Sequence, residues 1–261
     1  MGMNKRDFLK ITGLAAVTLK AGSAKGTLNI MEIRKRVAPD EKALNAKRWA
    51  MVVDVRKCKD GCTKCQDACH HIHNVPHIEN HEREIKWIWT EKFENAFAIP
   101  EIEARLIPEK LKMQPIITLC NHCDNPPCVR VCPTQATFKR KSDGVVMMDY
   151  HRCIGCRFCM AGCPYGSRSF NFSDPREHLH EKDINKKFPT RMKGVVEKCN
   201  FCAERLAVGQ IPACVEACPE KALVFGDLDD PQSEVINLIR ENFTIKRRPE
   251  LGTLPMVYYI V

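Results

Sequence analysis

Sixteen cysteines, gathered into four groups of four, constrain this 261-residue chain more than any other feature. The third group runs Cys153-Ile-Gly-Cys156-Arg-Phe-Cys159-Met-Ala-Gly-Cys163-Pro164, which is a C-x2-C-x2-C-x3-C-P spacing. Such a tight run lets the thiolates of one loop surround a 4Fe–4S cluster. Structural zinc sites use two separated pairs of ligands, and a disulfide framework does not require cysteines three residues apart. The third group therefore predicts iron–sulfur ligation.

The other three groups are variants of the same run, so the chain contains an internal repeat. The first group has one extra residue in its opening gap and His70 where the others have proline. The second has a longer middle gap, and in the fourth group eleven residues separate the second cysteine from the third. These groups add the ligand candidates Cys58, Cys62, Cys65 and Cys69, then Cys120, Cys123, Cys128 and Cys132, and finally Cys199, Cys202, Cys214 and Cys218.

Short apolar segments flank the cysteine groups, at 49–55, 136–138, 144–148, 169–172 and 222–225. Strand, cysteine loop, short helix and strand form the unit of a ferredoxin domain that binds two clusters. We therefore predict an α+β fold with two bacterial ferredoxin-like domains. Groups two and three are adjacent and form one domain, 112–173. Groups one and four form a discontinuous domain from 44–111 and 174–245, and a C-terminal extension, 246–261, docks on the body or on a partner.

The ligands of each cluster follow from a rule of two-cluster ferredoxins, in which the fourth cysteine of each run binds the other cluster. Crossed ligation holds paired clusters close together, so four clusters in series would act as a wire for electrons. The predicted sets are Cys58, Cys62, Cys65 and Cys218 for cluster 1; Cys199, Cys202, Cys214 and Cys69 for cluster 2; Cys120, Cys123, Cys128 and Cys163 for cluster 3; and Cys153, Cys156, Cys159 and Cys132 for cluster 4.

The formal charge of +9 would by itself suggest an acidic partner such as nucleic acid. Each oxidised cluster with its four thiolates carries about −2, however, so four clusters would bring the protein close to neutrality. We find no G-x-G-x-x-G, G-x-S-x-G or H-E-x-x-H motif, and we predict no catalytic residues. Basic residues beside the cysteines could tune potentials, although solvated surface charge explains most such residues; they are Lys57, Lys59, Arg130, Arg152, Arg157 and Lys198.

Residues 1–24 have the order of an export signal: a basic segment, Asn4–Lys10, a short apolar stretch and small residues. The order is similar to a twin-arginine signal in which Lys5 replaces the first arginine. An amphipathic start to the first domain is the alternative, and the signal could stay attached as an anchor. Beyond residue 25 no apolar run is long enough to span a bilayer. We therefore expect a peripheral, complex-bound protein on the exported face of the cytoplasmic membrane.

Two insertions separate the groups. The first begins with a histidine-rich stretch, 70–81, whose histidines we place at a surface or an interface in preference to haem or metal binding. Within it, Glu84–Trp89 alternates like a strand with one buried face. The second insertion, 174–198, is strongly charged and is predicted to be a solvated loop over the clusters. An apolar stretch at 236–239 predicts a helix.

The four groups in this order resemble the four-cluster ferredoxin-type subunits of membrane redox complexes. The motifs Cys120-Asn-His-Cys-Asp-Asn-Pro-Pro-Cys-Val-Arg-Val-Cys-Pro133 and Gly194-Val-Val-Glu-Lys-Cys-Asn-Phe-Cys202 carry this resemblance, which extends from Arg48 to the C-terminus. In that family the first group pairs with the fourth and the second with the third, as predicted above. Cys69-His-His-Ile-His-Asn-Val-Pro76 and Glu84–Trp89 are similar to DsrO-type subunits, the periplasmic iron–sulfur subunits of DsrMKJOP complexes linked to dissimilatory sulfite reduction.

The resemblance implies two partners, a quinone-interacting membrane subunit of the NrfD type and a haem c subunit. We therefore expect an electron-transfer subunit with four 4Fe–4S clusters, in a complex that contains further redox subunits and no nucleic acid. One alternative keeps the clusters but makes the chain the β subunit of a molybdopterin oxidoreductase or a hydrogenase. A remote alternative is a binding module structured by zinc.

Overall fold

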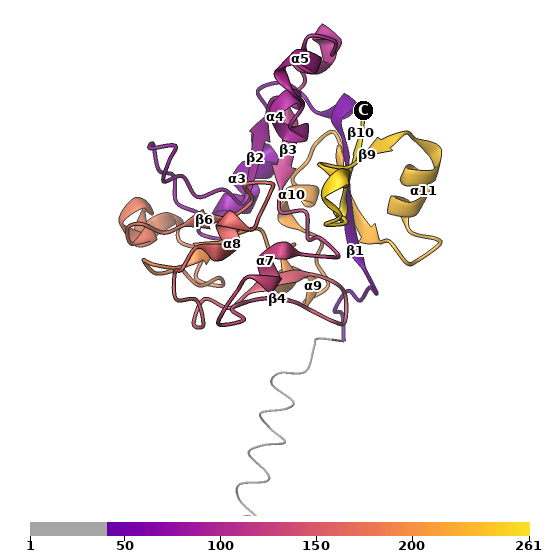
Figure 1. The fold of residues 1–261 in the computed structure, drawn as a ribbon. Helices are drawn as coiled ribbons and strands as arrows, with labels where there is room; N and C mark the ends of the chain where they lie inside the picture. The colour runs from indigo at the N-terminus through magenta and orange to yellow at the C-terminus, as the bar shows by residue number, and fades with distance from the viewer. Residues whose placement is uncertain (1–40) are drawn as a thin grey trace, which may run out of the picture. The chain divides into compact units, whose positions relative to one another are not determined.

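The computed structural model describes residues 41–261, and the unit Leu44–Val261 contains all the elements below (Figure 1). The predicted export signal, 1–24, lies outside the described residues. The strands are β1 (Trp49–Asp54), β2 (Ile88–Glu91), β3 (Ile116–Leu119), β4 (Thr137–Lys139), β5 (Val146–Met148), β6 (Ser169–Phe170), β7 (Val196–Glu197), β8 (Leu223–Asp227), β9 (Thr244–Ile245) and β10 (Val257–Ile260).

Most helices are single turns that follow cysteine loops or lie in the insertions. The third cysteine of each group lies inside a helix and is buried, Cys65 in the longer α3 and the others in single turns. The α-helices are α3 (Lys64–Ile72), α4 (Phe93–Phe97), α5 (Glu101–Ala104), α6 (Glu109–Lys112), α7 (Pro127–Arg130), α8 (Phe158–Ala161), α9 (Ala203–Leu206), α10 (Ala213–Glu216) and α11 (Glu234–Glu241). The 3-10 helices are η1 (Val55–Lys57), η2 (Pro175–His178), η3 (Glu181–Asp183) and η4 (Pro249–Leu251).

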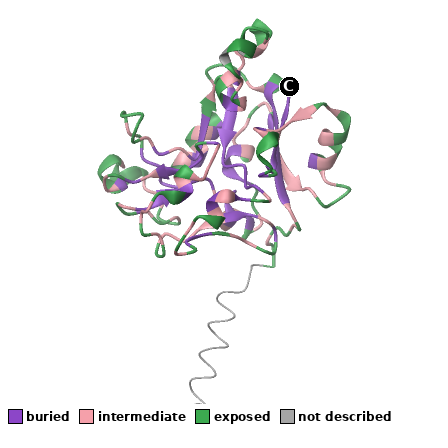
Figure 2. Cartoon of the chain, in the orientation of Figure 1, coloured by how far each residue is buried: buried purple, intermediate pink, exposed green. Residues whose placement is uncertain are grey.

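The largest sheet has four strands in the order β8-β1-β10-β9. Its strand β1 is buried along its whole length (Figure 2). Because successive side chains of a strand point to opposite faces, Met51 and Val53 join the main core. Ala50 and Val52 pack on the other side, where α11 contributes the fully buried Val235.

The pairing of β1 brings the first and fourth cysteine groups to the same sheet. Strand β1, which precedes the first group, pairs antiparallel with β8, which follows the fourth, with Met51 opposite Phe225. Between the second and third groups β4 pairs with β5, and β6 pairs with β7, which leads into the fourth group. The remaining pair, β2 and β3, lies in the first insertion. These ladders link the flanks of the first group to the fourth, of the second to the third, and of the third to the fourth.

Several sequence expectations are confirmed at the level of single elements. The apolar segments at 49–55, 136–138, 144–148, 169–172 and 222–225 overlap β1, β4, β5, β6 and β8, and the stretch 236–239 lies within α11. In Glu84–Trp89 the buried face is present at Ile85 and Trp87, but ladder pairing begins only at Ile88. The segment 246–261 docks on the body, and there its strand β10 pairs with both β1 and β9.

The prediction of a solvated loop at 174–198 is wrong for its second half. Arg191, Glu197 and Lys198 are buried, and Val195 and Val196 lie with them. The reason is that β7 pairs with β6, which draws the end of the insertion into the interior. No helix between residues 41 and 261 has the length and apolarity to cross a membrane.

Candidate iron–sulfur sites

All sixteen cysteines lie in the described part of the chain, and all are free thiols. A disulfide scaffold is therefore excluded. Nine of the sixteen are buried and seven are partly buried, which suits ligands that must be shielded from water.

One small cavity collects thiols from the first and fourth groups. It is lined by Cys58, Cys62, Cys65 and Cys218, and Ile117 contributes to its apolar wall. The backbone N–H of Ala222 donates to Cys218 Sγ at 3.3 Å. Burial, followed by the charge of Cys218, raises the pKa of Cys65 to about 12.

A second cavity collects thiols from the second and third groups. Cys120, Cys123, Cys128 and Cys163 line it. Burial, followed by the charge of Cys120, raises the pKa of Cys123 to about 12. In both cavities, three thiols come from one group and the fourth comes from another.

The thiols of the predicted cluster 2 form the most deeply buried set. Burial raises the pKa of Cys69 well above its ordinary value, and the charges of Cys199, Cys202 and Cys214 raise it further. The N–H groups of Phe201 and Ala213 donate to the sulfurs of Cys199 and Cys202, at 3.4 and 3.5 Å.

The loops of the predicted cluster 4 meet through α7 and α8. A Cβ placed on Gly162, between Cys159 and Cys163, would lie 3.1 Å from the side chain of Val131, the neighbour of Cys132. The N–H of Thr137 donates to Cys132 Sγ at 3.4 Å. These contacts bring the second and third groups together.

The donor set fits iron–sulfur clusters on chemical grounds. Burial opposes the ionisation of these thiols, and each thiolate in a set raises the pKa of its neighbours. A cationic iron core reverses this balance, because a thiol that binds a metal is deprotonated. Backbone N–H groups that point at sulfur are the usual means of stabilising the negative charge that remains.

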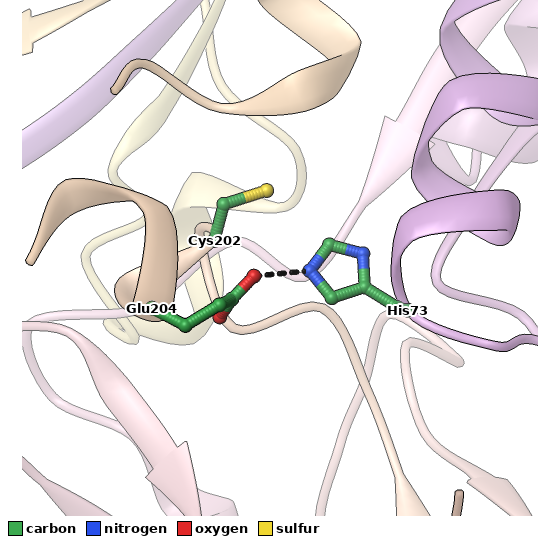
Figure 3. Close-up of side chains that lie close together, drawn as sticks. All are labelled: His73, Cys202 and Glu204. Atoms are coloured by element: carbon green, nitrogen blue, oxygen red, sulfur yellow. Dashed lines mark hydrogen bonds and ion pairs between the residues drawn. The ribbon is translucent and has the colours of Figure 1, made fainter. Parts of the chain in front are cut away.

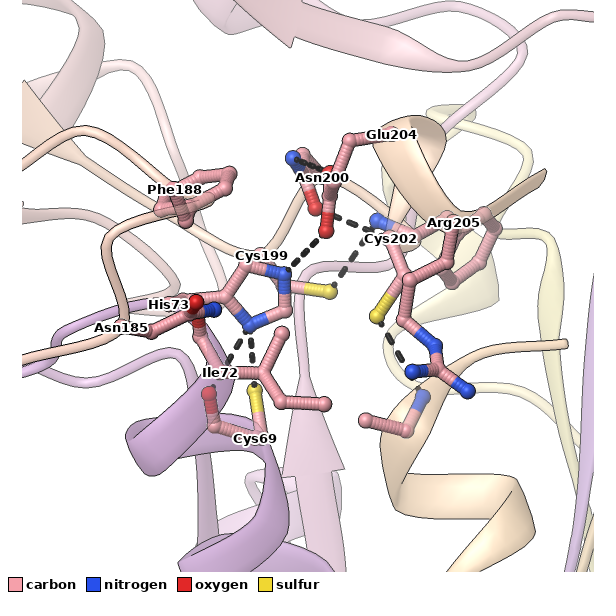
Figure 4. Close-up of polar contacts among 12 residues, drawn as sticks. Cys69, Ile72, His73, Asn185, Phe188, Cys199, Asn200, Cys202, Glu204 and Arg205 are labelled. Carbon is pink, nitrogen blue, oxygen red and sulfur yellow. Dashed lines mark hydrogen bonds and ion pairs between the residues drawn. The ribbon is translucent and has the colours of Figure 1, made fainter. Parts of the chain in front are cut away.

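His73 is the histidine that the surface prediction missed. Its side chain is buried, whereas His71, His77 and His81 are exposed as predicted. Nδ1 lies 2.9 Å from the carbonyl oxygen of Cys69 and 3.5 Å from its sulfur (Figure 4). Both are acceptors once Cys69 is a thiolate, so Nδ1 carries a hydrogen. The signal for this contact was the i, i+4 spacing of Cys69 and His73 on a helix.

The other ring nitrogen of His73 faces the fourth cysteine group. Nε2 lies 2.8 Å from Oε1 of Glu204, close to the thiol of Cys202 (Figure 3). The ring stacks on Trp87 with centroids 4.5 Å apart, and Phe188 packs edge-on against it with centroids 4.8 Å apart. These contacts fix the imidazole between the first and fourth groups.

A buried ion pair lies beside Trp87, the residue that stacks on this histidine. Arg191 Nε lies 2.7 Å from Glu197 Oε2, with both side chains fully buried. The contact is purely ionic, because Nε makes no hydrogen bond. Trp87 Nε1 and Asn171 Nδ2 donate to the same carboxylate at 2.9 and 2.5 Å, while Arg191 Nη2 donates to the Asn74 carbonyl at 2.9 Å. The pair therefore ties the end of the second insertion to the loop after α3.

Of the six basic residues suggested as tuning groups, only Lys198 is buried. Its Nζ donates to the carbonyl oxygens of Val146 and Cys199, the latter at 2.7 Å. The other five are exposed to solvent, as expected for surface charge: Lys57, Lys59, Arg130, Arg152 and Arg157.

Two further features beside the clusters were not anticipated from the sequence. The ring of His122 stacks on Phe201 at 3.7 Å, so the second and fourth groups meet through the residues between their first two cysteines. Arg168 is buried, and its Nη2 donates to Cys128 Sγ at 3.1 Å. Only its place five residues after Cys163 could have drawn attention to it.

Comparison with known proteins points to iron–sulfur clusters. A family model described as a 4Fe–4S dicluster domain matches residues 111–182 and 176–228. The Hdr-like menaquinol oxidoreductase iron–sulfur subunit 1 of Archaeoglobus fulgidus is 43% identical over 98% of this chain and 97% of its own length. Protein NrfC of Escherichia coli is 34% identical over 100% and 96%. The iron–sulfur cluster-binding subunit of menaquinone reductase from Nitratidesulfovibrio vulgaris is 34% identical over 82% and 88%.

This chain belongs to the family of iron–sulfur subunits built from ferredoxin-type 4Fe–4S dicluster domains. The family assignment and the sixteen free thiols together make it an iron–sulfur protein of electron transport.

Proposed function

We propose that this protein carries four 4Fe–4S clusters, held by the four crossed ligand sets predicted from the sequence, and that it conducts electrons along them. The observation that carries the proposal is the composition of the two cavities. Each is lined by three thiols of one cysteine group and the fourth thiol of another. When bound, the clusters supply one-electron transfer, and the chain supplies ligands, burial and N–H donors to sulfur.

The electrostatic contacts between thiols support a linear order of the sets. The charge of Cys65, a ligand of cluster 1, contributes to the raised pKa of Cys214 in cluster 2. The charge of Cys120, in cluster 3, contributes in the same way at Cys199 in cluster 2. Cys128 of cluster 3 likewise acts on Cys159 of cluster 4. The order 1-2-3-4 follows from these neighbours.

Exposure along this series supports a conducting role with two accessible ends. All four thiols of the central cluster 2 set are buried. At the two ends, Cys58, Cys62 and Cys218 in cluster 1 and three of the four thiols in cluster 4 are partly exposed. Electrons would then enter and leave through the terminal clusters.

Anaerobic purification tests the cluster number. The proposal expects about sixteen iron atoms per chain and EPR signals from four reduced clusters. Fewer than about twelve iron atoms would contradict four clusters. A colourless, zinc-loaded protein would instead support the zinc-structured module.

We further propose that the subunit works at the exported face of a membrane, in a quinone-linked complex with an NrfD-like membrane subunit and a haem c subunit. Two relatives are named for menaquinol or menaquinone, which supports the quinone link. The link to sulfite reduction rests on the DsrO-like segments Cys69–Pro76 and Glu84–Trp89.

The subunits of a gently solubilised membrane complex test this second proposal. Co-purification of an NrfD-like protein and a c-type cytochrome is the expected result. A large molybdenum or nickel subunit in their place would decide for the β subunit of a molybdopterin oxidoreductase or hydrogenase.

A further inference from the structure

The guanidinium of Arg168 lies between the second and third cysteine groups. Nη2 donates to Cys128 Sγ and Nη1 donates to Thr137 Oγ1, both at 3.1 Å. The residue is only 4% exposed, and it lines the cavity of the proposed cluster 3. The backbone N–H of Thr137 in turn donates to Cys132 Sγ, a ligand of the proposed cluster 4, at 3.4 Å. One cation is therefore bonded directly to a ligand of cluster 3 and, through Thr137, linked to a ligand of cluster 4.

This cation has no carboxylate partner within residues 41–261. None of the ion pairs found there includes Arg168, and its buried Nε has no hydrogen-bond partner. Arginine stays charged at every pH at which proteins fold. A buried charge without a counter-charge strongly destabilises a fold. The negative charge that balances Arg168 must therefore come from the thiolates and the clusters they hold.

The neighbouring buried cations show that this arrangement is not a general feature of the interior. Arg191 is paired with Glu197 at 2.7 Å. The ammonium of Lys198 donates to backbone carbonyl oxygens. Arg168, in contrast, directs its charge at sulfur.

We propose that Arg168 is a positioning residue that raises the reduction potentials of clusters 3 and 4 together, and so makes electrons settle in that half of the series. The proposal rests on the ligand sets of the proposed function. Reduction of a cluster adds one electron from an external donor, and the cluster becomes more negative by one charge. A fixed cation bonded to a ligand thiolate stabilises this reduced form more than the oxidised form.

Redox titration of the cluster-loaded protein, followed by EPR, tests the proposal. In Arg168→Gln, two of the four midpoint potentials should each fall by about 59 mV. This shift corresponds to about a tenfold decrease in the equilibrium constant for one-electron reduction. The other two potentials should stay unchanged. Arg168→Lys keeps the charge but loses the planar fork, so its potentials should lie between those of the wild type and the glutamine variant.

Arg152→Gln is the matched control. Arg152 adjoins Cys153, but its side chain is 63% exposed and is paired with Asp149 at 3.3 Å. Removal of this charge should alter each equilibrium constant by less than about twofold, because solvent screens it.

Unchanged potentials in an Arg168→Gln protein with full iron content would overturn the proposal. An equal fall of all four potentials would also overturn it, because that pattern indicates a general loosening. If the glutamine variant loses iron, Arg168→Lys is compared with the wild type instead. Two midpoint potentials that are lower in Arg168→Lys support the proposal, and four potentials equal to those of the wild type overturn it. A wild-type protein with fewer than about twelve iron atoms would instead contradict the proposed function, before any variant is compared.

Discussion

Replacement of Glu197 by glutamine should destabilise this protein more than most single substitutions. The change leaves the guanidinium of Arg191 buried without its counter-charge, since the two side chains are fully buried and 2.7 Å apart. Removal of one partner of such a pair costs about 3–5 kcal/mol. For a chain of this size each kcal/mol lowers the melting temperature by about 2–4 °C, so the expected decrease is about 6–20 °C. The lower end applies if the new amide keeps accepting from Trp87 Nε1.

Anaerobic calorimetry at one scan rate measures this effect, with two variants for comparison. Asp174→Asn breaks an exposed ion pair with Arg176 and should change the melting temperature little. The double variant Arg191→Met/Glu197→Gln removes both charges and should recover part of the loss, because no buried charge is left unpaired. A Glu197→Gln protein with the same melting temperature as the Asp174→Asn control would refute the reasoning.

Three further predictions concern the cysteine loops and the sheet that supports them. Cys163→Ala should damage the cluster of the second cysteine group first, and loss of only the Cys153 cluster, seen by EPR, would contradict crossed ligation. Gly155→Ala should remove about four iron atoms per chain, because φ is +69° and the new Cβ would lie 2.4 Å from the Gly194 carbonyl oxygen. Gly166→Ala, at φ +63° with no atom within 4 Å, is the control and should keep its iron. A hydrogen bond from Arg56 is the main cause that lowers the pKa of Asp54 below its ordinary 3.8. The stabilisation that ionised Asp54 gives the fold is therefore present at neutral pH and lost as the pH falls below about 4. The unfolding free energies of wild type and Asp54→Asn, measured with denaturant, should differ above about pH 5 and converge below about pH 4.

The cysteine loops and their flanking strands could be predicted because their determinants are local. The spacing of Cys153–Pro164 lies within one loop, and segments such as 144–148 carry their own apolar pattern. The rule that the fourth cysteine of each run binds the other cluster then predicts the ligand sets from the order of the groups alone. For these reasons the sequence was sufficient to predict the strands β4 and β5.

The features that the sequence did not reveal depend on distant partners. His73 is buried because the carboxylate of Glu204, 131 residues away, meets its Nε2, and because Trp87 covers one face of the ring. A histidine in a stretch of exposed histidines gives no hint of this. Likewise, the charged end of the second insertion is buried because Trp87 donates to Glu197 and Arg191 donates to the Asn74 carbonyl, both more than 100 residues away. Arg168 was missed because an arginine is ordinarily a surface residue.

The pairing of β1 with β10 has a consequence for the timing of assembly. Met51 lies opposite Val257 in a parallel ladder, so the strand before the first cysteine group gains this neighbour only after Val257 has been made. At 5–20 residues per second, the ribosome needs roughly 10–40 s to cover that distance. In the proposed ligand sets, the second and third groups are complete once Cys163 has been made, whereas Cys58, Cys62 and Cys65 must wait for Cys218. Iron delivered during synthesis would therefore fill the interior pair of groups first and the outer pair last.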